Sequence, residues 1–316
     1  MRETDFRLKD QEGVELFVRR WEPGSGKPKA VVQLEHGVAE HSGRYAATAE
    51  ALCAAGYAVY ADDHRGHGYS AEATGGLGRL GPGGWEAVVR DLGLLSDRVA
   101  EEMPGLPLFL VGHSWGSYLA QDYAQRWGHR LAGLVLVGTS GGQPFLVKGV
   151  GPWVGRLFVL FLGRDRPSRI ADAFAFKPYN RPYLPSPTDS DSDWISRDIE
   201  EVRSFVDDPA CAFPLTTGLS LEMSLAFRRL WRPGMEARIP KSLPILLMSG
   251  TDDASNGRLK YLLPFAERLR KRGHEDLTLK LYEGARHCIL HETNRGEVKA
   301  DLVAWLDSRF GKRKAG

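Results

Sequence analysis

The chain has 316 residues, a formal net charge of +2 and an apolar fraction of 42%, an ordinary composition for a globular protein. A nearly balanced charge, without a basic stripe interleaved with aromatic residues, argues against a protein that binds nucleic acid. The three cysteines (Cys53, Cys211 and Cys288) have no C-x-x-C spacing, so neither a disulfide framework nor a zinc site is expected.

Secretory and membrane-spanning segments are not expected either. The N-terminus is charged and lacks the apolar run of a signal peptide. The longest apolar region, residues 145–162, contains Lys148, Arg156 and several glycines, so it is too interrupted to span a membrane. Scattered thiols fit a reducing compartment, and we therefore predict a cytoplasmic protein.

The apolar pattern predicts strands that alternate with helices. An antiparallel pair of strands comes first, at residues 6–9 and 14–21, around a turn that contains glycine. Buried strands follow at residues 30–34, 57–61, 107–111, 131–137, 245–248 and 277–282, and helices at residues 44–55, 85–102, 117–127, 258–272 and 295–309. Unbroken apolar strands separated by helices are typical of a parallel sheet covered on both faces.

The alternation is interrupted between residues 141 and 238. This stretch contains short helical patches, aromatic residues and a polar, proline-rich run at 177–193, and no clear strand. We therefore expect an α/β fold whose core is formed by residues 1–140 and 239–316. A helical cap would be inserted at residues 141–238.

A candidate nucleophile lies in the sequence Gly-His-Ser-Trp-Gly at residues 112–116, between a predicted strand and a predicted helix. In that context G-x-S-x-G forms a nucleophile elbow, a tight turn that exposes the hydroxyl of the serine. Gly112 and Gly116 have no side chains to clash where strand and helix nearly touch. The amides at the start of the helix would face the developing negative charge. Ser114 is therefore the predicted nucleophile.

An acid and a histidine follow later strands in the order that such a serine requires. Asp252 and Asp253 follow the strand at 245–248, and His287 follows the strand at 277–282. Serine, acid and histidine occur in this chain order in α/β-hydrolases. A histidine can remove the serine proton near neutral pH, and a carboxylate orients its imidazole. Because parallel strands present their carboxyl ends at one edge, we expect these groups to meet.

Two backbone donors and the neighbouring histidines complete the predicted site. The oxyanion hole would be formed by the N–H groups of Trp115, which follows the nucleophile, and of Val38 in the first strand–helix loop. His113 is a rival base, but the elbow strand holds it away from a remote acid. His36 and His64 are expected to hold loops through hydrogen bonds.

Metal ions and organic cofactors are not expected. His287 and His291 are four residues apart, but they lack the H-E-x-x-H form and further ligands. Residues 66–71 match the dinucleotide pattern G-x-G-x-x-A. Because no helix opens directly on this pattern, it argues weakly for a nicotinamide cofactor.

The chain resembles the α/β-hydrolase fold and, within it, the monoacylglycerol lipase and bacterial lysophospholipase-like group of the serine aminopeptidase S33 type. The resemblance spans nearly the whole chain and is carried by residues 36–45 (HGVAEHSGRY), 63–70 (DHRGHGYS), 112–116 (GHSWG), 249–253 (SGTDD) and 282–287 (YEGARH). It implies that Asp253 is the acid, with Asp252 as the second choice, and that Val38 and Trp115 supply the oxyanion donors. Methionine often follows the nucleophile in this group, so the indole of Trp115 is a departure that would narrow the acyl pocket.

We interpret the chain as a serine hydrolase that cleaves carboxylic esters of the monoacylglycerol or lysophospholipid type through an acyl-enzyme on Ser114. The alternatives are a peptidase or amide hydrolase, an acyltransferase, and a non-catalytic binder that retains the pocket. The apolar cap residues at 145–147, Trp153 and 157–162 suit an acyl chain, although packing of the cap on the core would also explain them. A transient contact of the cap with lipid surfaces is a further hypothesis, and the oligomeric state is left open.

Overall fold

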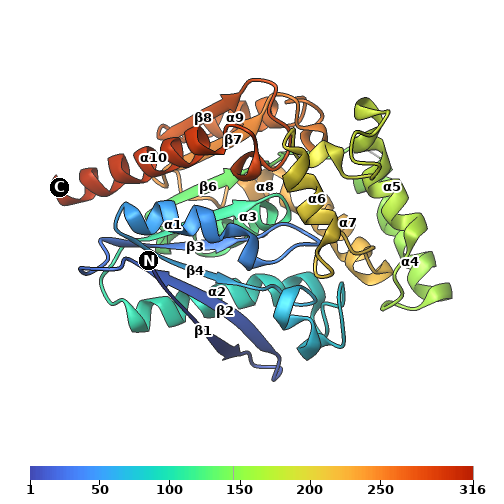
Figure 1. The fold of residues 1–316 in the computed structure, drawn as a ribbon, viewed down its shortest axis with the longest axis horizontal. Coiled ribbons are helices and arrows are strands. Elements are labelled where there is room, and N and C mark those ends of the chain that lie inside the picture. The colour runs from blue at the N-terminus through green and yellow to red at the C-terminus, as the bar shows by residue number, and fades with distance from the viewer. Residues whose placement is uncertain (145, 316) are drawn as a thin grey trace.

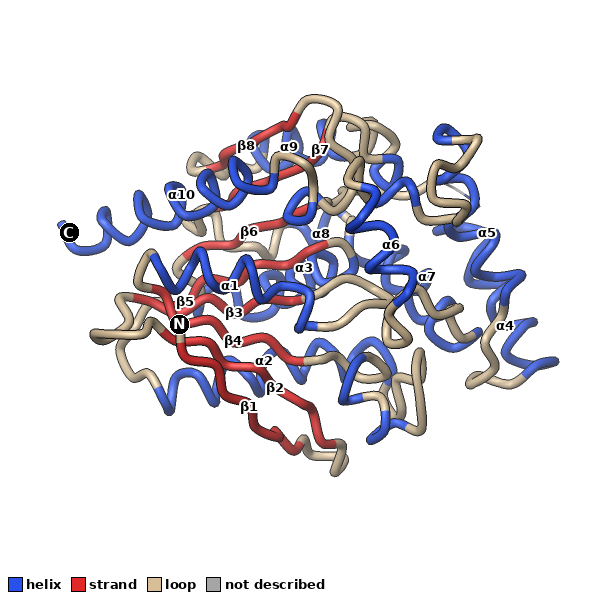
Figure 2. The backbone as a smooth tube through the Cα atoms, viewed as in Figure 1, coloured by secondary structure: helices blue, strands red, loops and turns tan. Residues whose placement is uncertain are grey.

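The structure is a computed structural model that describes residues 1–144 and 146–315, and an eight-stranded sheet forms its centre (Figures 1 and 2). The strands are β1 (Arg2–Lys9), β2 (Glu15–Glu22), β3 (Ala30–Glu35), β4 (Tyr57–Asp62), β5 (Leu108–His113), β6 (Gly133–Val137), β7 (Ile245–Gly250) and β8 (Leu277–Tyr282). The helices are α1 (Ala46–Ala54), α2 (Gly84–Glu102), α3 (Trp115–Trp127), α4 (Gly151–Leu162), α5 (Arg169–Asn180), α6 (Ile199–Asp207), α7 (Thr217–Leu230), α8 (Pro233–Glu236), α9 (Leu262–Lys271) and α10 (Arg295–Ala315).

The strand order in the sheet is β1-β2-β4-β3-β5-β6-β7-β8. Strands β1 and β2 are antiparallel to each other, β2 is antiparallel to β4, and the remaining pairs are parallel. The predicted α/β fold with a mostly parallel sheet is confirmed. The chain leaves β3 towards β4 on one side and returns to β5 on the other. Ligands of open α/β sheets bind at such a reversal, beyond the carboxyl ends of the strands.

Both faces of the sheet are buried, which explains the unbroken apolar strands. On β6, Leu134 and Leu136 belong to a core that includes side chains of α2, α3 and α9. Val135 and Val137 point to the other face, where the core includes side chains of α1 and α10. Because successive side chains of a strand point to opposite faces, a strand covered on both sides needs an apolar residue at every position.

One predicted helix, at residues 258–272, begins later than expected. Asp253 caps a short 3-10 turn at Ala254–Asn256, and Arg258 and Leu259 then have φ angles of 52° and 71°. A right-handed helix cannot include residues in that conformation, so α9 starts at Leu262.

The stretch between β6 and β7 carries α4 to α8, and within its described residues the only pairing of extended backbone is an isolated bridge between Pro167 and Thr216. Figure 1 shows α4, α5, α6 and α7 gathered at one end of the sheet. The limits of the predicted cap, 141 and 238, stay a prediction. None of the helices within the described residues is both long and apolar enough to cross a membrane.

Candidate active site

Ser114 occupies the sharp turn between β5 and α3, with φ 50° and ψ −118°. A positive φ is uncommon for a residue with a side chain and strains the backbone. A Cβ atom on Gly112 would lie 2.4 Å from the carbonyl oxygen of Gly116, and one on Gly116 would lie 2.3 Å from that of Glu35. Only glycine fits at either position, so the G-x-S-x-G spacing is what allows this turn to form.

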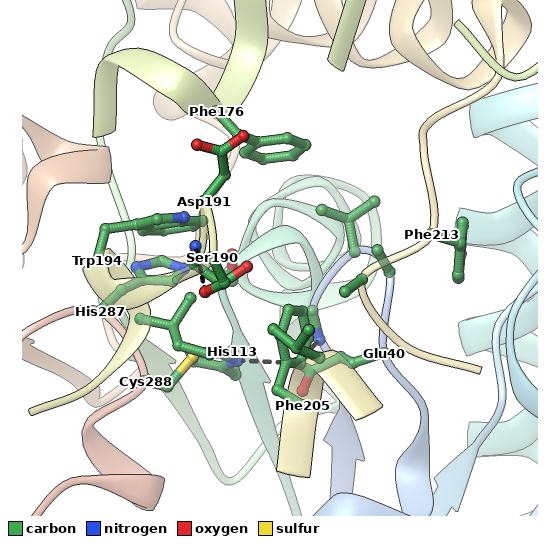
Figure 3. Close-up of a pocket in the computed structure, with 18 residues that line it drawn as sticks. Glu40, His113, Phe176, Ser190, Asp191, Trp194, Phe205, Phe213, His287 and Cys288 are labelled. Atoms are coloured by element: carbon green, nitrogen blue, oxygen red, sulfur yellow. Dashed lines mark hydrogen bonds and ion pairs between the residues drawn. The ribbon is translucent and has the colours of Figure 1, made fainter. Parts of the chain in front are cut away.

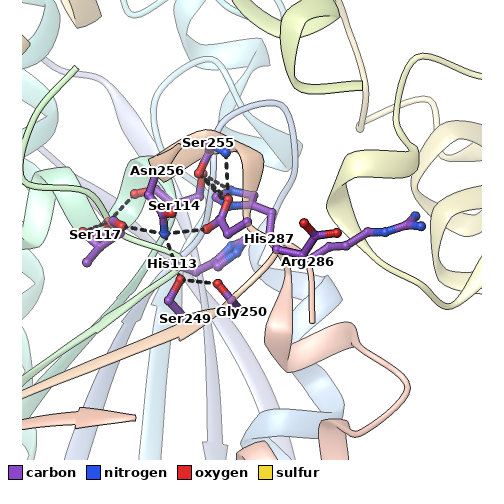
Figure 4. A network of polar contacts seen from close by, with 12 residues as sticks. His113, Ser114, Ser117, Ser249, Gly250, Ser255, Asn256, Arg286 and His287 are labelled. Carbon is purple, nitrogen blue, oxygen red and sulfur yellow. Dashed lines mark hydrogen bonds and ion pairs between the residues drawn. The ribbon is translucent and has the colours of Figure 1, made fainter. Parts of the chain in front are cut away.

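The side chains of Ser114, His287 and Asp253 meet in one chain of hydrogen bonds. The hydroxyl of Ser114 donates to Nε2 of His287 at 2.7 Å. Nδ1 of His287 then carries the ring proton and donates to the carboxylate of Asp253, at 3.0 Å to Oδ2 and 3.1 Å to Oδ1. His287 and Asp253 are both buried, and Figure 4 shows the imidazole next to Ser114. The three predicted residues are therefore brought together from the ends of β5, β7 and β8.

Asp253 rather than Asp252 faces the imidazole. Asp252 is about one-third exposed and pairs with Arg258, whose Nε lies 2.6 Å from its Oδ1. Burial alone would raise the pKa of the Asp253 carboxyl. The charge and hydrogen bond of His287, together with hydrogen bonds from Ser255, outweigh that effect and hold this pKa below its usual value. Asp253 therefore stays ionised beside the imidazole.

The amides of Val38 and Trp115 are available for an oxyanion. Both residues line a cavity together with Ser114. Trp115 is the first residue of α3, where the amide has no partner within the helix. Across residues 1–144 and 146–315, neither amide donates to another group of the protein. Their role as the oxyanion donors stays a prediction, and such a hole would require two free amides of this kind.

A buried carboxylate holds the loop that carries Val38. Oε1 of Glu40 accepts hydrogen bonds from the amide of Gly37 at 2.6 Å and from the hydroxyl of Tyr45 at 2.7 Å. The same oxygen lies 3.2 Å from Nδ1 of His113, and Arg44 pairs with Oε2 at 3.0 Å. Burial would raise the pKa of the Glu40 carboxyl, but His113 and Arg44 hold it well below its usual range.

His113, His36 and His64 hold loops rather than act on Ser114. His113 is engaged by Glu40 and Tyr45, so it does not act on Ser114. His36 accepts from the amide of His64 through Nε2 at 3.0 Å, and its Nδ1 donates to the carbonyl of Gly37 at 2.7 Å. These contacts agree with the loop-holding role expected for His36 and His64. The role of Glu40 was not expected, because nothing in its spacing distinguishes it from a solvent-exposed acid.

Within the described residues, two groups of side chains have the donor types of a metal site, and side chains of both groups form hydrogen bonds within the protein. Glu35, Asp62 and His64 are fully buried, and His64 donates to Asp62 at 3.0 Å. In the second group, His41, Asp208 and Cys211, Nδ1 of His41 accepts from the amide of Gly43 and Nε2 contacts Asp208 at 2.9 Å. Nδ1 of His41 therefore holds the loop after β3, and Nε2 joins this loop to the segment after α6.

Two cavities meet at Ser114, and both include Val38, Phe176 and Trp194 in their walls. The larger, of about 290 Å³, is shown in Figure 3; Ser190 and Asp191 give it a polar side above His287. The smaller, of about 120 Å³, has mainly apolar and aromatic walls: Trp115, Tyr118, Val147, Tyr179, Leu215, Met223 and Phe227. The smaller cavity thus suits an apolar chain, and the polar side of the larger cavity suits a polar group.

Trp194 lies over the imidazole of His287. Its ring centroid is 4.8 Å from that of the imidazole, and its rings also pack near Phe176 and Tyr179. The amide of Cys288 donates to the carbonyl of Ile195 at 2.7 Å, which fixes the two segments to each other. Trp194, Phe176 and Tyr179 were missed as wall residues because the sequence does not show which side of a short helix or turn faces the cavity.

The apolar residues expected over the acyl chain are mostly placed elsewhere. Val147 lines the smaller cavity. In contrast, Trp153, Leu157, Leu160 and Phe161 of α4 are 64%, 53%, 74% and 77% exposed. These four side chains neither line the cavities nor lie buried in the core, so they do not form the expected cover of the acyl chain. Residue 145 and the side chain at 146 are outside the described residues.

Strand topology, the serine elbow and the neighbouring histidine and acid together define an α/β-hydrolase. The sequence matches the family Serine aminopeptidase, S33, over residues 26–294. The chain belongs to this family, and it is a hydrolase of carboxylic esters.

Similar proteins agree with this assignment over nearly the full chain. Monoglyceride lipase of Homo sapiens is 32% identical over 96% of this chain and 90% of its own length. Monoacylglycerol lipase of Mycolicibacterium smegmatis is 30% identical over 94% of this chain and 95% of its own. The crystal structure of a thermostable carboxyl esterase from Bacillus coagulans, in complex with glycerol, superposes with a TM-score of 0.88. It is 27% identical and covers 98% of this chain and 99% of its own.

Proposed function

We propose that this protein hydrolyses monoacylglycerol-type esters, with Ser114 as nucleophile, His287 as base and Asp253 as the acid that orients His287. The observation that carries the proposal is the hydroxyl of Ser114, which donates to His287 at 2.7 Å at the junction of the two cavities. Relatives named for monoglyceride hydrolysis support the same substrate class.

In the first half-reaction, Oγ of Ser114 attacks the ester carbonyl carbon while its proton passes to Nε2 of His287. Asp253 stabilises the imidazolium that forms. The carbonyl oxygen becomes an oxyanion that accepts hydrogen bonds from the amides of Val38 and Trp115. His287 then returns the proton to the departing alcohol, and the acyl group remains on Ser114.

In the second half-reaction, water takes the place of the alcohol. His287 removes a proton from the water as it attacks the acyl-enzyme, and a second oxyanion forms in the same position. Collapse of this intermediate releases the carboxylic acid, and His287 returns the proton to Oγ of Ser114. An acyltransferase would differ only in that an alcohol replaces the water.

The charge of the cavity walls favours an uncharged head group. Among the described residues that line the two cavities, none is a lysine or arginine, whereas Asp191 lies on the polar side. The cation beside Asp191 is the exposed Lys177, whose Nζ lies 4.0 Å from Oδ2 of Asp191, so a phosphate would have to compete with this carboxylate for it and would be repelled by Asp191. Glycerol hydroxyls can accept from and donate to the serines beside Asp191. We therefore favour a monoacylglycerol over a lysophospholipid.

A panel of substrates tests the proposal. We expect hydrolysis of p-nitrophenyl and glyceryl esters, much slower hydrolysis of lysophospholipids, and slower hydrolysis still of amino-acid amides. Ser114→Ala should lower kcat by up to about 10⁶-fold. Wild-type turnover in that folded variant would contradict the proposal, and faster cleavage of the amides would favour the peptidase alternative. Labelling of the native serine by a fluorophosphonate separates the enzyme from a non-catalytic binder.

The exposed residues of α4 favour contact with a lipid surface. Trp153, Leu157, Leu160 and Phe161 are spaced by three or four residues, so they share one face of the helix. An exposed apolar face of this kind is typical of interfacial helices. We include a peripheral contact with membranes in the proposal, and the cytoplasmic location stays a prediction.

Flotation with neutral phosphatidylcholine vesicles tests this contact. Changing Leu160 and Phe161 together to serine should abolish co-flotation and slow hydrolysis of monoacylglycerol in vesicles, with no change on a water-soluble ester. Leu184→Ser is the matched control, since Leu184 is 61% exposed and lies outside α4. Equal flotation of the double variant and the wild type would contradict the contact.

A further inference from the structure

Ser255 is a buried residue whose side chain contacts both His287 and Asp253. It lies in the 3-10 turn that follows β7, and it is 8% exposed. Its hydroxyl oxygen is 2.7 Å from Oδ1 of Asp253 and 3.0 Å from Nδ1 of His287 (Figure 4). Both distances are within hydrogen-bond range.

The directions of the two hydrogen bonds follow from the chemistry of the partners. An ionised carboxylate can only accept, so the hydroxyl of Ser255 donates to Asp253. Nε2 of His287 accepts from Ser114, so the single ring proton is on Nδ1. This proton points to Asp253 and also to a lone pair of the Ser255 oxygen. Ser255 thus bridges the acid and the base.

Other donors to the carboxylate do not reach the imidazole in this way. The amide of Ser255 donates to Oδ1 of Asp253 at 2.8 Å, and Nδ2 of Asn256 donates to Oδ2 at 3.2 Å. These contacts fix the position of the carboxylate. They do not touch the imidazole, whose tilt is set by its two hydrogen bonds with Asp253. The hydroxyl of Ser255 adds a third oxygen at 3.0 Å, in a position that limits rotation of the ring.

We infer that Ser255 is a positioning residue of the ester hydrolysis, because its hydroxyl holds the imidazole of His287 and the carboxylate of Asp253 in fixed mutual orientation. The inference rests on the roles proposed above for Ser114, His287 and Asp253. Ser255 acts through these residues and does not touch the reacting atoms. Loss of the Ser255 hydroxyl should therefore lower kcat rather than raise KM. The loss should occur only when the carboxylate of Asp253 is present.

A double-mutant cycle between Ser255 and Asp253 tests the inference. Ser255→Ala should lower kcat about tenfold on a water-soluble ester, with KM changed less than about twofold, as expected for losing one hydrogen bond to a charged group. In the Asp253→Asn background the same change should have little further effect, below about twofold. Ser255→Thr keeps the hydroxyl and should restore kcat to within about threefold of the wild type.

Ser96→Ala is the matched control for loss of a buried hydroxyl. The hydroxyl of Ser96 donates to Gln33 at 2.7 Å, is also buried, and lies on α2 outside both cavities. This variant should be destabilised like Ser255→Ala but keep its kcat. If Ser255→Ala does not fold, Ser255→Cys replaces it. A thiol is a poor donor, so that variant should also lose kcat, by at least about threefold.

Distinct results contradict the inference and the proposed function. Wild-type kcat in Ser255→Ala, or an equal loss of kcat in the Asp253→Asn background, would overturn the positioning role while Ser114→Ala remained inactive. Turnover by Ser114→Ala would overturn the proposed function itself. A rate of fluorophosphonate labelling that falls with kcat in Ser255→Ala would support the inference, because that reaction also needs the serine proton to be removed.

Discussion

The buried carboxylate of Glu40 holds the loop that carries Val38. Replacement of Glu40 by glutamine measures how much this carboxylate contributes to the stability of the protein and to the rate of ester hydrolysis. The side chain is 3% exposed, and it joins Gly37 and Tyr45 through Oε1 and Arg44 through Oε2. Glutamine has nearly the same shape and keeps an acceptor oxygen for Gly37 and Tyr45. It removes the negative charge and places an NH₂ group against the guanidinium of Arg44.

The size of the effect follows from the burial of Arg44. Its side chain is 8% exposed, so without Glu40 its charge would be both buried and unpaired. Breaking a buried ion pair from one side costs about 3–5 kcal/mol of the free energy of unfolding. Because the guanidinium also lies over the ring of Phe205 at 4.9 Å, we expect the lower end, about 3 kcal/mol.

The same change should reduce the rate of ester hydrolysis. Gly37 precedes Val38, so a weaker bond from the amide of Gly37 to residue 40 lets the oxyanion donor of Val38 move. Complete loss of one such donor lowers kcat by about 10²–10³-fold. Glutamine keeps the acceptor, and we therefore expect a partial loss of about tenfold.

Urea unfolding, followed by tryptophan fluorescence, and kcat on p-nitrophenyl butyrate measure the two effects in Glu40→Gln. Tyr45→Phe is the control, because it removes one neutral donor and leaves the ion pair intact; its cost should be near 1 kcal/mol. The reasoning would be refuted by wild-type stability and kcat in Glu40→Gln, or by a larger loss in Tyr45→Phe.

Three further predictions concern the acid, the apolar cavity and the pH dependence of stability. Asp253→Asn should lower kcat by about 10³–10⁴-fold, whereas Asp252→Asn, which changes a partly exposed residue paired with Arg258, should stay within about twofold in the same ester assay. Trp115→Met should widen the smaller cavity, so the preferred acyl length on a series of p-nitrophenyl esters should increase; an unchanged profile would contradict that. Burial lowers the pKa of His67 to about 3, so its stabilising contribution is complete above pH 6.5 and is lost as the pH falls from there towards 3. Between pH 7 and pH 5 this loss amounts to about 2 kcal/mol of the free energy of unfolding. Urea unfolding should show that the free energy of unfolding of His67→Asn falls less over that pH range than that of the wild type.

The sheet and the three residues at its edge could be predicted because local sequence determines them. An apolar residue at every position indicates a strand buried on both faces, as in β5 and β6. The glycines at 112 and 116 mark a turn in which a Cβ atom would clash, and this places Ser114 without knowledge of distant contacts. Asp253 and His287 follow the next strands, and topology then brings them to the same edge.

Glu40 and Ser255 could not be predicted, because their roles depend on contacts between distant segments. Glu40 binds His113, and Ser255 binds His287, across separations of 73 and 32 residues. An acid in a loop, or a serine after an aspartate, is common in proteins and carries no periodic signal. Only the packing of the loops shows that these side chains are buried and which atoms they face.

The walls of the apolar cavity were misjudged for a related reason. Helix α4 is apolar around most of its circumference, so its composition alone does not tell which side packs inward. In the structure α4 packs on α7, where Leu221 lies close to Gly155, and its larger apolar side chains remain exposed. The cavity is instead lined from α5 and α7, through Phe176, Met223 and Phe227 among others. The contact with a lipid surface proposed above would give the exposed tryptophan, leucine and phenylalanine of this helix an apolar environment.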